Sequence, residues 1–171
     1  RGYKVAICEQ VEEASEAVGI TRREVVQIIT PGTVTGEGQL DDTENNYLCA
    51  VQLRKKGGYS CSYVDISTGE FRCFSLDTLS ELQALIDRIQ AKELIVNKED
   101  GIELNTEALI NTEYFESVSA ASQELQRHFN ISSMASFGLD GFEDSFPAAW
   151  AIISYVKLTQ KSALSQLTKL A

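Results

Sequence analysis

Apolar and polar positions alternate in a way that divides the chain into a short N-terminal piece and a longer second unit. Residues 5–8 and 24–30 are runs of apolar and β-branched residues, which predict two strands. The Glu- and Ala-rich residues 11–18 between them predict a helix that ends at Gly19, and the Pro-Gly pair at 31–32 ends the second strand. A strand–helix–strand piece of this size buries its own faces poorly, so we expect it to close a larger domain.

The second unit opens with three strand-like runs. Before it, residues 34–44 are rich in glycine and acidic residues and have no apolar period, which predicts a linker. The runs themselves, at 47–53, 59–66 and 70–75, are joined by short glycine-containing turns, so they predict an antiparallel meander. The first run is almost continuously apolar, which is typical of a central strand buried on both faces.

After the meander the apolar period changes to three and four residues, which indicates a helix. Leu79, Leu82 and Ile86 recur on one helical face, and Thr78 and Glu81 have the spacing of a capping box. The next predicted elements are a strand at 93–97, a helix at 104–110, a fifth strand at 114–118 and a helix at 122–129. Ser145 and Pro147 open a final predicted helix, and its apolar residues Phe146, Trp150, Ile153 and Val156 fall on one side.

This order of elements predicts an α/β fold. A meander followed by helical crossovers gives a mixed sheet, because each right-handed crossover returns a strand parallel to its neighbour. We therefore expect a ribonuclease-H-like mixed sheet with strand order 3-2-1-4-5, flanked by helices and preceded by the strand–helix–strand piece.

The net charge of −10 argues against strong DNA binding by this chain. Phosphate contacts require clustered cations. The densest basic run, residues 54–56, lies beside two glycines and reads as a solvated hairpin turn. No apolar run approaches the ~20 residues that cross a bilayer, and no signal peptide is apparent, so we expect a cytoplasmic protein.

The residues that most often carry chemistry favour structural roles. Cys8, Cys49, Cys61 and Cys73 lie in apolar, strand-like runs without zinc-site spacing, so we expect buried, reduced thiols and no bound metal. The single His128 lacks the accompanying motif of a nucleophilic catalyst.

A divalent-metal nuclease is the alternative function, because ribonuclease-H-like folds often host one. Such a site needs several converging carboxylates, and nucleases of this fold resemble one another in carrying one in the first strand. Residues 47–53 contain no Asp or Glu. Asp65 and Glu70 instead flank the second turn, where Asp65 and Ser67 are expected to shape the chain through side-chain hydrogen bonds.

Five segments carry a resemblance to a known family. They are Arg1-Gly-Tyr-Lys-Val-Ala-Ile-Cys-Glu-Gln, Arg23-Glu-Val-Val-Gln-Ile-Ile-Thr-Pro-Gly-Thr, Asn45-Asn-Tyr-Leu, Asp65-Ile-Ser-Thr-Gly-Glu-Phe and Tyr155-Val-Lys-Leu-Thr-Gln-Lys. In this order they resemble the end of the mismatch-recognition domain and then the connector domain of bacterial MutS proteins. The resemblance implies a recognition-domain fragment at 1–33, a linker at 34–44, and a connector at 45–171 that leads into a core domain.

The resemblance also implies partners and absent sites. The parent protein would recognise mismatched DNA and use ATP and Mg²⁺, but this chain has no phosphate-binding loop, and neither Phe115 nor Phe142 fits the family's Phe-x-Glu wedge. We therefore expect a non-catalytic piece without cofactors that contacts the other domains of its own protein. By resemblance, a MutL-type partner docks on the helix at 121–130, through Gln123, Glu124 and Arg127; the alternative is an ordinary amphipathic helix.

Overall fold

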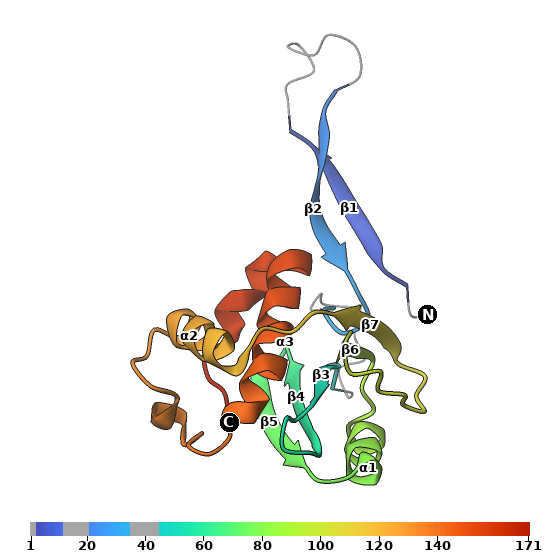
Figure 1. Cartoon of the computed structure of the whole chain (residues 1–171). Coiled ribbons are helices and arrows are strands. Elements are labelled where there is room, and N and C mark those ends of the chain that lie inside the picture. The colour runs from blue at the N-terminus through green and yellow to red at the C-terminus, as the bar shows by residue number, and fades with distance from the viewer. Residues whose placement is uncertain (1–2, 12–20, 35–44) are drawn as a thin grey trace.

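The structure, a computed structural model, describes residues 3–11, 21–34 and 45–171. Within these ranges, a five-stranded mixed sheet with helices on both faces forms the body, and a two-stranded ribbon projects from it (Figure 1). The predicted helix at 11–18 and the predicted linker at 34–44 fall, except for one terminal residue each, outside the described residues.

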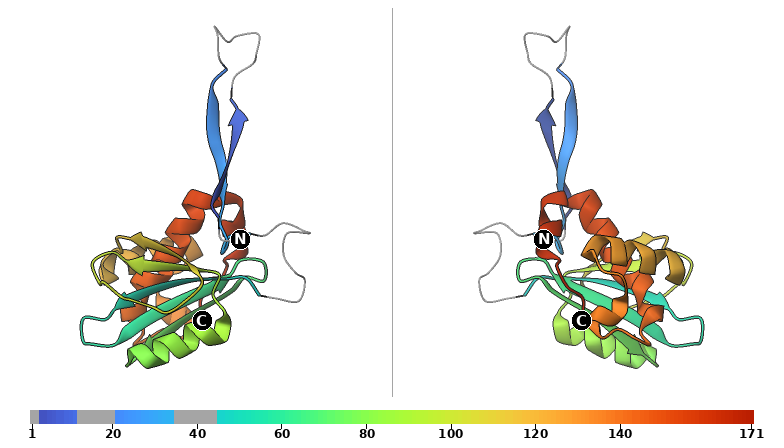
Figure 2. Two further views of the ribbon diagram at one scale, coloured as in Figure 1. Left: turned by 90° about the vertical axis from the view of Figure 1, so that its right-hand side faces the viewer. Right: turned by 90° about the vertical axis from the view of Figure 1, so that its left-hand side faces the viewer.

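The ribbon consists of β1 (Val5–Gln10) and β2 (Arg23–Ile29), which pair antiparallel. Both strands were predicted, and both are confirmed. Figure 2 shows the ribbon standing away from the body, which it meets at its base, where β2 ends. Most of its side chains are exposed; Val25 and Val26, for example, keep 55% and 51% of their surface. Among the described residues, the ribbon therefore contacts the body mainly at its base.

The sheet has the order β5-β4-β3-β6-β7, with antiparallel pairing on one side of β3 and parallel pairing on the other. Residues 47 to 52 of the central strand β3 are all buried, which confirms the predicted central strand. The five strands are β3 (Tyr47–Leu53), β4 (Tyr59–Asp65), β5 (Glu70–Leu76), β6 (Glu93–Asn97) and β7 (Leu109–Glu113).

Helices cover the two faces of the sheet unequally. The helix α1 (Leu79–Ile89) covers one face, where Leu82, Leu85 and Ile86 pack on the sheet. On the opposite face, α2 (Val118–Phe129) and α3 (Phe146–Thr159) build the larger core, and the ribbon projects on this side (Figure 2). Three short 3-10 helices complete the body: η1 (Met134–Phe137), η2 (Glu143–Ser145) and η3 (Lys161–Gln166).

Two predicted elements before α2 are wrong. The predicted helix at 104–110 is extended chain that leads into β7, and the predicted strand at 114–118 lies beyond the end of β7. Exposure alternates residue by residue from 101 to 108, which is the period of extended chain. Pairing with β6 then sets the position of β7, with Glu93 opposite Leu109.

The final helix begins where it was predicted to begin but differs from its prediction in its buried surface. Its apolar residues were expected on one side, but Ile152 and Tyr155 are buried as well, since α3 packs between the sheet, α2 and η3. Pro147 lies in the first turn, as predicted. Ser145 is the N-cap residue, also as predicted; its hydroxyl makes no cap hydrogen bond and instead donates to the carbonyl of Phe142 at 2.6 Å.

The cysteines divide between body and ribbon. Cys49, Cys61 and Cys73 are buried free thiols, as expected, and burial raises the pKa of Cys73 to about 11. Cys8 is exposed, so the prediction of a buried thiol is wrong there. Its strand lies in the projecting ribbon rather than in a packed sheet.

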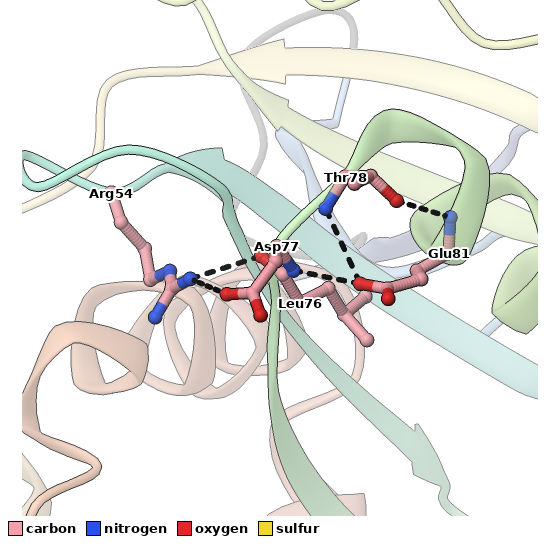
Figure 3. A network of polar contacts seen from close by, with 5 residues as sticks. All are labelled: Arg54, Leu76, Asp77, Thr78 and Glu81. Carbon is pink, nitrogen blue, oxygen red and sulfur yellow. Dashed lines mark hydrogen bonds and ion pairs between the residues drawn. The ribbon is translucent and has the colours of Figure 1, made fainter.

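A network of hydrogen bonds caps the N-terminus of α1 and connects it to the β3–β4 turn (Figure 3). The Thr78 hydroxyl accepts from the Glu81 amide at 3.2 Å, and Glu81 Oε2 accepts from the amides of Thr78 at 3.3 Å and Asp77 at 2.8 Å. This is the predicted capping box. Arg54 donates to the Leu76 carbonyl at 3.1 Å and pairs with Asp77 at 2.9 Å. Arg54, the first residue of the basic run at 54–56, therefore stabilises the start of α1.

Thr78→Ala tests the cap. The variant loses the acceptor for the Glu81 amide, so its free energy of unfolding should fall by about 1 kcal/mol in a urea titration. Ser80→Ala is the matched control, because Ser80 is exposed in the first turn of the same helix; its change should stay within about 0.5 kcal/mol. Equal losses in the two variants would contradict the assigned cap.

Candidate functional site

The carboxylate of Glu93, at the start of β6, has no exposed surface and four hydrogen-bond donors around it. Its Oε2 accepts from the Thr30 hydroxyl at 2.6 Å and the Gly32 amide at 2.9 Å. Its Oε1 accepts from the Asn111 side-chain amide at 2.6 Å and the Tyr155 hydroxyl at 2.5 Å. We call these five residues the Glu93 cluster. Four donors match the acceptor capacity of a carboxylate, which offsets the cost of its burial.

The cluster joins four separate parts of the chain. Thr30 and Gly32 belong to the turn that follows β2, Glu93 to β6, Asn111 to β7 and Tyr155 to α3. The ribbon, two neighbouring parallel strands and the C-terminal helix therefore meet at a single side chain.

The turn at 30–33 is held in shape and lies directly on the sheet. The Thr33 amide donates to the Thr30 carbonyl at 3.0 Å, and the Thr30 amide donates to the Thr33 hydroxyl at 3.1 Å. A Cβ added to Gly32 would lie 2.9 Å from the Glu93 Cβ and 3.0 Å from the Leu48 Cβ. Only glycine allows this approach without displacing the turn.

Further contacts surround the cluster. The Lys4 ammonium of the N-terminal segment lies 5.5 Å from the centre of the Tyr155 ring, within the range of a cation–π interaction. Burial, and then the hydrogen bond to Glu93, raise the pKa of Tyr155 above its ordinary value. Beside the cluster, a cavity of about 1060 Å³ lies between the ribbon base, the end of α1 and the loop before β7, and its lining includes Pro31, Ile86 and Leu109.

Asp65 has the turn-shaping role predicted for it. Its Oδ1 accepts from the Ser67 amide at 2.9 Å and the Ser67 hydroxyl at 2.6 Å, and its Oδ2 accepts from the Asn46 amide at 3.3 Å. Glu70 accepts from the Tyr47 hydroxyl at 2.8 Å and pairs with Arg72 at 2.8 Å. Within residues 3–11, 21–34 and 45–171, no three His, Cys, Asp or Glu side chains are grouped to hold a metal ion.

The predicted docking residues lie together on α2. Gln123 and Arg127 are exposed, and Glu124 is partly exposed and forms an ion pair with Arg127. We call Gln123, Glu124 and Arg127 the α2 surface. Leu125 is fully buried and anchors the helix from the opposite side. The three polar side chains thus share a solvent-facing surface.

His128 has a packing role. One ring nitrogen lies 3.1 Å from the Leu167 carbonyl, and the ring contacts the edge of Phe129 with centroids 4.8 Å apart. Burial lowers the pKa of His128 from its ordinary value. The contact with Leu167 connects α2 to the segment that follows η3.

Sequence reasoning missed the Glu93 cluster. Residues 93–97 were predicted as a strand, but Glu93 was not singled out, and Pro31 and Gly32 were interpreted only as the end of a strand. One signal was available: an acidic residue begins a strand whose next three residues are apolar. Its partners could not be named, because Thr30 and Tyr155 lie 63 and 62 residues away.

Comparison with known proteins shows which class of protein this arrangement belongs to. Residues 1–38 match the family model of MutS domain I, and residues 46–168 match that of MutS domain II. The ribbon and the sheet thus belong to two successive domains of one multidomain family, and the chain belongs to the MutS family. Among the described residues, no helix is long and apolar enough to span a membrane.

Individual relatives agree with the family match. The chain is 36% identical to the DNA mismatch repair protein MutS of Chlorobaculum parvum over 180 residues, which cover 99% of this chain and 20% of that protein. Identity is 38% to the MutS of Dehalococcoides mccartyi and 41% to that of Halothermothrix orenii, with 100% and 99% of this chain covered and 20% of each relative. The chain therefore spans about a fifth of the length of these relatives.

Tyr155→Phe tests the cluster through alkaline unfolding. The variant removes a donor to a buried carboxylate, so its free energy of unfolding should fall by about 2 kcal/mol at neutral pH. The raised pKa of Tyr155 means that the unfolded chain loses this proton first, near pH 10. The contribution of Tyr155 is thus complete below about pH 10 and declines above it.

The difference between parent and variant should therefore be constant below about pH 10 and shrink above it. Denaturant titrations followed by the fluorescence of Trp150, the single tryptophan, would measure it. A difference that stays constant through this range would contradict the assigned environment of Tyr155.

Asp65→Ala separates the structural role of Asp65 from a metal site. The variant leaves the donors of Ser67 and Asn46 without their acceptor, so its free energy of unfolding should fall by about 1–3 kcal/mol. Asp140→Ala, at an exposed position, is the control. Neither the parent nor the variants should cleave labelled DNA or RNA with Mg²⁺. Reproducible cleavage that disappears in Asp65→Ala would favour the nuclease.

Proposed function

We propose that this chain is a non-catalytic connector within a MutS-type mismatch-repair protein. Its ribbon closes the mismatch-recognition domain, and its sheet relays the state of that domain to the rest of the protein. The observation that carries this proposal is the Glu93 cluster, in which one buried carboxylate holds both the ribbon turn and the body.

The proposal includes a ribonuclease-H-like identity for the sheet. Three antiparallel strands followed by two parallel ones, with helices on both faces, support it. In this proposal the fold serves as a scaffold and not as a nuclease, since fold alone does not define function. Asp65 supports a scaffold rather than a nuclease, because both of its carboxylate oxygens accept hydrogen bonds that shape the local chain.

A relay requires that movement of one domain be transmitted rather than absorbed. Coupling between distant sites is carried by packed side chains and hydrogen-bond networks with defined arrangements. The ribbon base provides such a network: Thr30 and Thr33 are 1% and 0% exposed, and Gly32 lies against the sheet. Displacement of the ribbon would therefore act directly on β6 and, because α3 also contacts β2, on α3.

The complete protein would supply what this chain does not. We propose that it recognises mismatched DNA and binds ATP and Mg²⁺ in its other domains, in the cytoplasm. The relatives are named DNA mismatch repair protein MutS, which supports the role in mismatch repair. The net charge of −10 supports weak, unspecific DNA binding by this chain itself, because few cations are available for phosphate contacts.

We also propose the α2 surface as the docking site of a MutL-type partner. Gln123 offers an exposed amide, and Glu124 and Arg127 offer a carboxylate and a guanidinium that largely neutralise each other. A polar surface of this kind suits a reversible interface. The helix stays anchored through Leu125 and Ala121, so changes on its outer side should leave the fold intact.

Gln123→Ala combined with Glu124→Ala, in a complete MutS protein that carries this segment, tests the docking site. Capture of the MutL-type partner should be lost, while the melting temperature should change little, because exposed ion pairs contribute at most about 1 kcal/mol. Asp87→Ala with Arg88→Ala, two exposed neighbours on α1, is the matched control and should keep partner binding. Unchanged capture by the α2 variant would place the docking site elsewhere.

A further inference from the structure

The two oxygens of Glu93 serve different parts of the molecule. Among the described residues, Oε2 accepts only from the ribbon turn, through Thr30 at 2.6 Å and Gly32 at 2.9 Å. Oε1 accepts from the body, through Asn111 at 2.6 Å and Tyr155 at 2.5 Å. The carboxylate therefore bridges the ribbon and the body.

In the part of the chain that the structure describes, few other contacts hold the ribbon on the body. Beyond the turn, the ribbon exposes about half the surface of Val5, Val25 and Val26. α3 touches β2 near its end, and Lys4 lies over the Tyr155 ring. Both of these contacts also converge on the ribbon base, so the direction of the projecting strands depends on how that base is held.

We propose that Glu93 is an orientation lock: its Oε2 fixes the angle of the ribbon on the connector by holding the turn at 30–33 against the sheet. The lock deepens the proposed relay and rests on it for its biological meaning, because a freely pivoting ribbon could not pass the state of the recognition domain onward. Gly32 is part of the lock, since its missing Cβ lets the turn reach the carboxylate.

The lock predicts an asymmetry between variants that alter the two oxygens. Thr30→Val removes a ribbon-side donor at nearly constant shape, and Gly32→Ala places a methyl group 2.9 Å from the Glu93 Cβ and lifts the turn away. Both should release the ribbon. Tyr155→Phe is the matched control: it removes a body-side donor of the same carboxylate and leaves both ribbon-side hydrogen bonds in place.

A distance measurement on the 171-residue chain tests the lock. Cys8 is an exposed thiol on the ribbon, and Ser80→Cys adds a second exposed thiol on α1, while Cys49, Cys61 and Cys73 are buried and protected from labelling. Spin labels on the two exposed thiols report the ribbon angle by pulsed electron paramagnetic resonance. Circular dichroism should be recorded for each variant to check that its body stays folded.

The parent and Tyr155→Phe should give the same single, narrow distance peak. Thr30→Val should widen that peak, and Gly32→Ala should widen or shift it further. If both ribbon-side variants keep the parent peak, other contacts orient the ribbon and the lock is wrong. If Tyr155→Phe widens the peak as much as they do, the cluster acts as general packing, which also overturns the inference. Should Gly32→Ala fail to fold, Thr30→Val alone decides, because it adds no atoms to the interface.

The relay is tested separately, in a complete MutS protein with the same substitutions. Release of the ribbon should abolish the effect of mismatched DNA on capture of the MutL-type partner, while Tyr155→Phe should retain it. If the ribbon is released and the effect persists, the relay fails although the lock stands. An unchanged distance peak defeats the lock whatever the complete protein does, so the two failures are distinguishable.

Discussion

The carboxylate of Glu93 is the side chain on which the arrangement of this molecule depends. An unpaired charge without solvent contact would destabilise the fold by several kcal/mol. Four donors offset that cost, and they come from the turn after β2, from β7 and from α3. The sheet order, the position of α3 and the placement of the ribbon must therefore all be correct together.

The helices on the two faces of the sheet are held by different kinds of contact. α1 closes one face and is positioned locally, by its capping box and by Arg54. α2 and α3 close the other face and connect to the ribbon through Tyr155. Because Leu125 anchors α2 from within, its outer polar side chains remain available for a partner. The proposed docking site and the proposed lock thus lie on the same side of the sheet without sharing residues.

Local patterns predicted most of the elements, and their failures have a common physical cause. The central strand was evident because burial on both faces requires a continuous apolar run, and the start of α1 because a capping box is a contact over three residues. Between residues 104 and 118 the apolar residues do not alternate as they would in a strand with one buried face, and pairing with β6 decided where the strand lies. For α3, packing on nearly all sides removed the one-sided pattern that the sequence was expected to show.

The sequence by itself determined the family and the mixed character of the sheet, since both depend on the order of residues and elements along the chain. It also determined the turn at Asp65 and the polar outer side of α2, since both depend on residues that are near neighbours in the chain. Only the tertiary structure showed which carboxylate is buried and hydrogen-bonded to both the ribbon and the body. Glu93 meets partners 18, 61, 62 and 63 residues away, and no local period records such distances. Tertiary packing also exposed Cys8, by placing its strand in a projecting ribbon. A buried charge acquires its role from the donors that the fold brings to it.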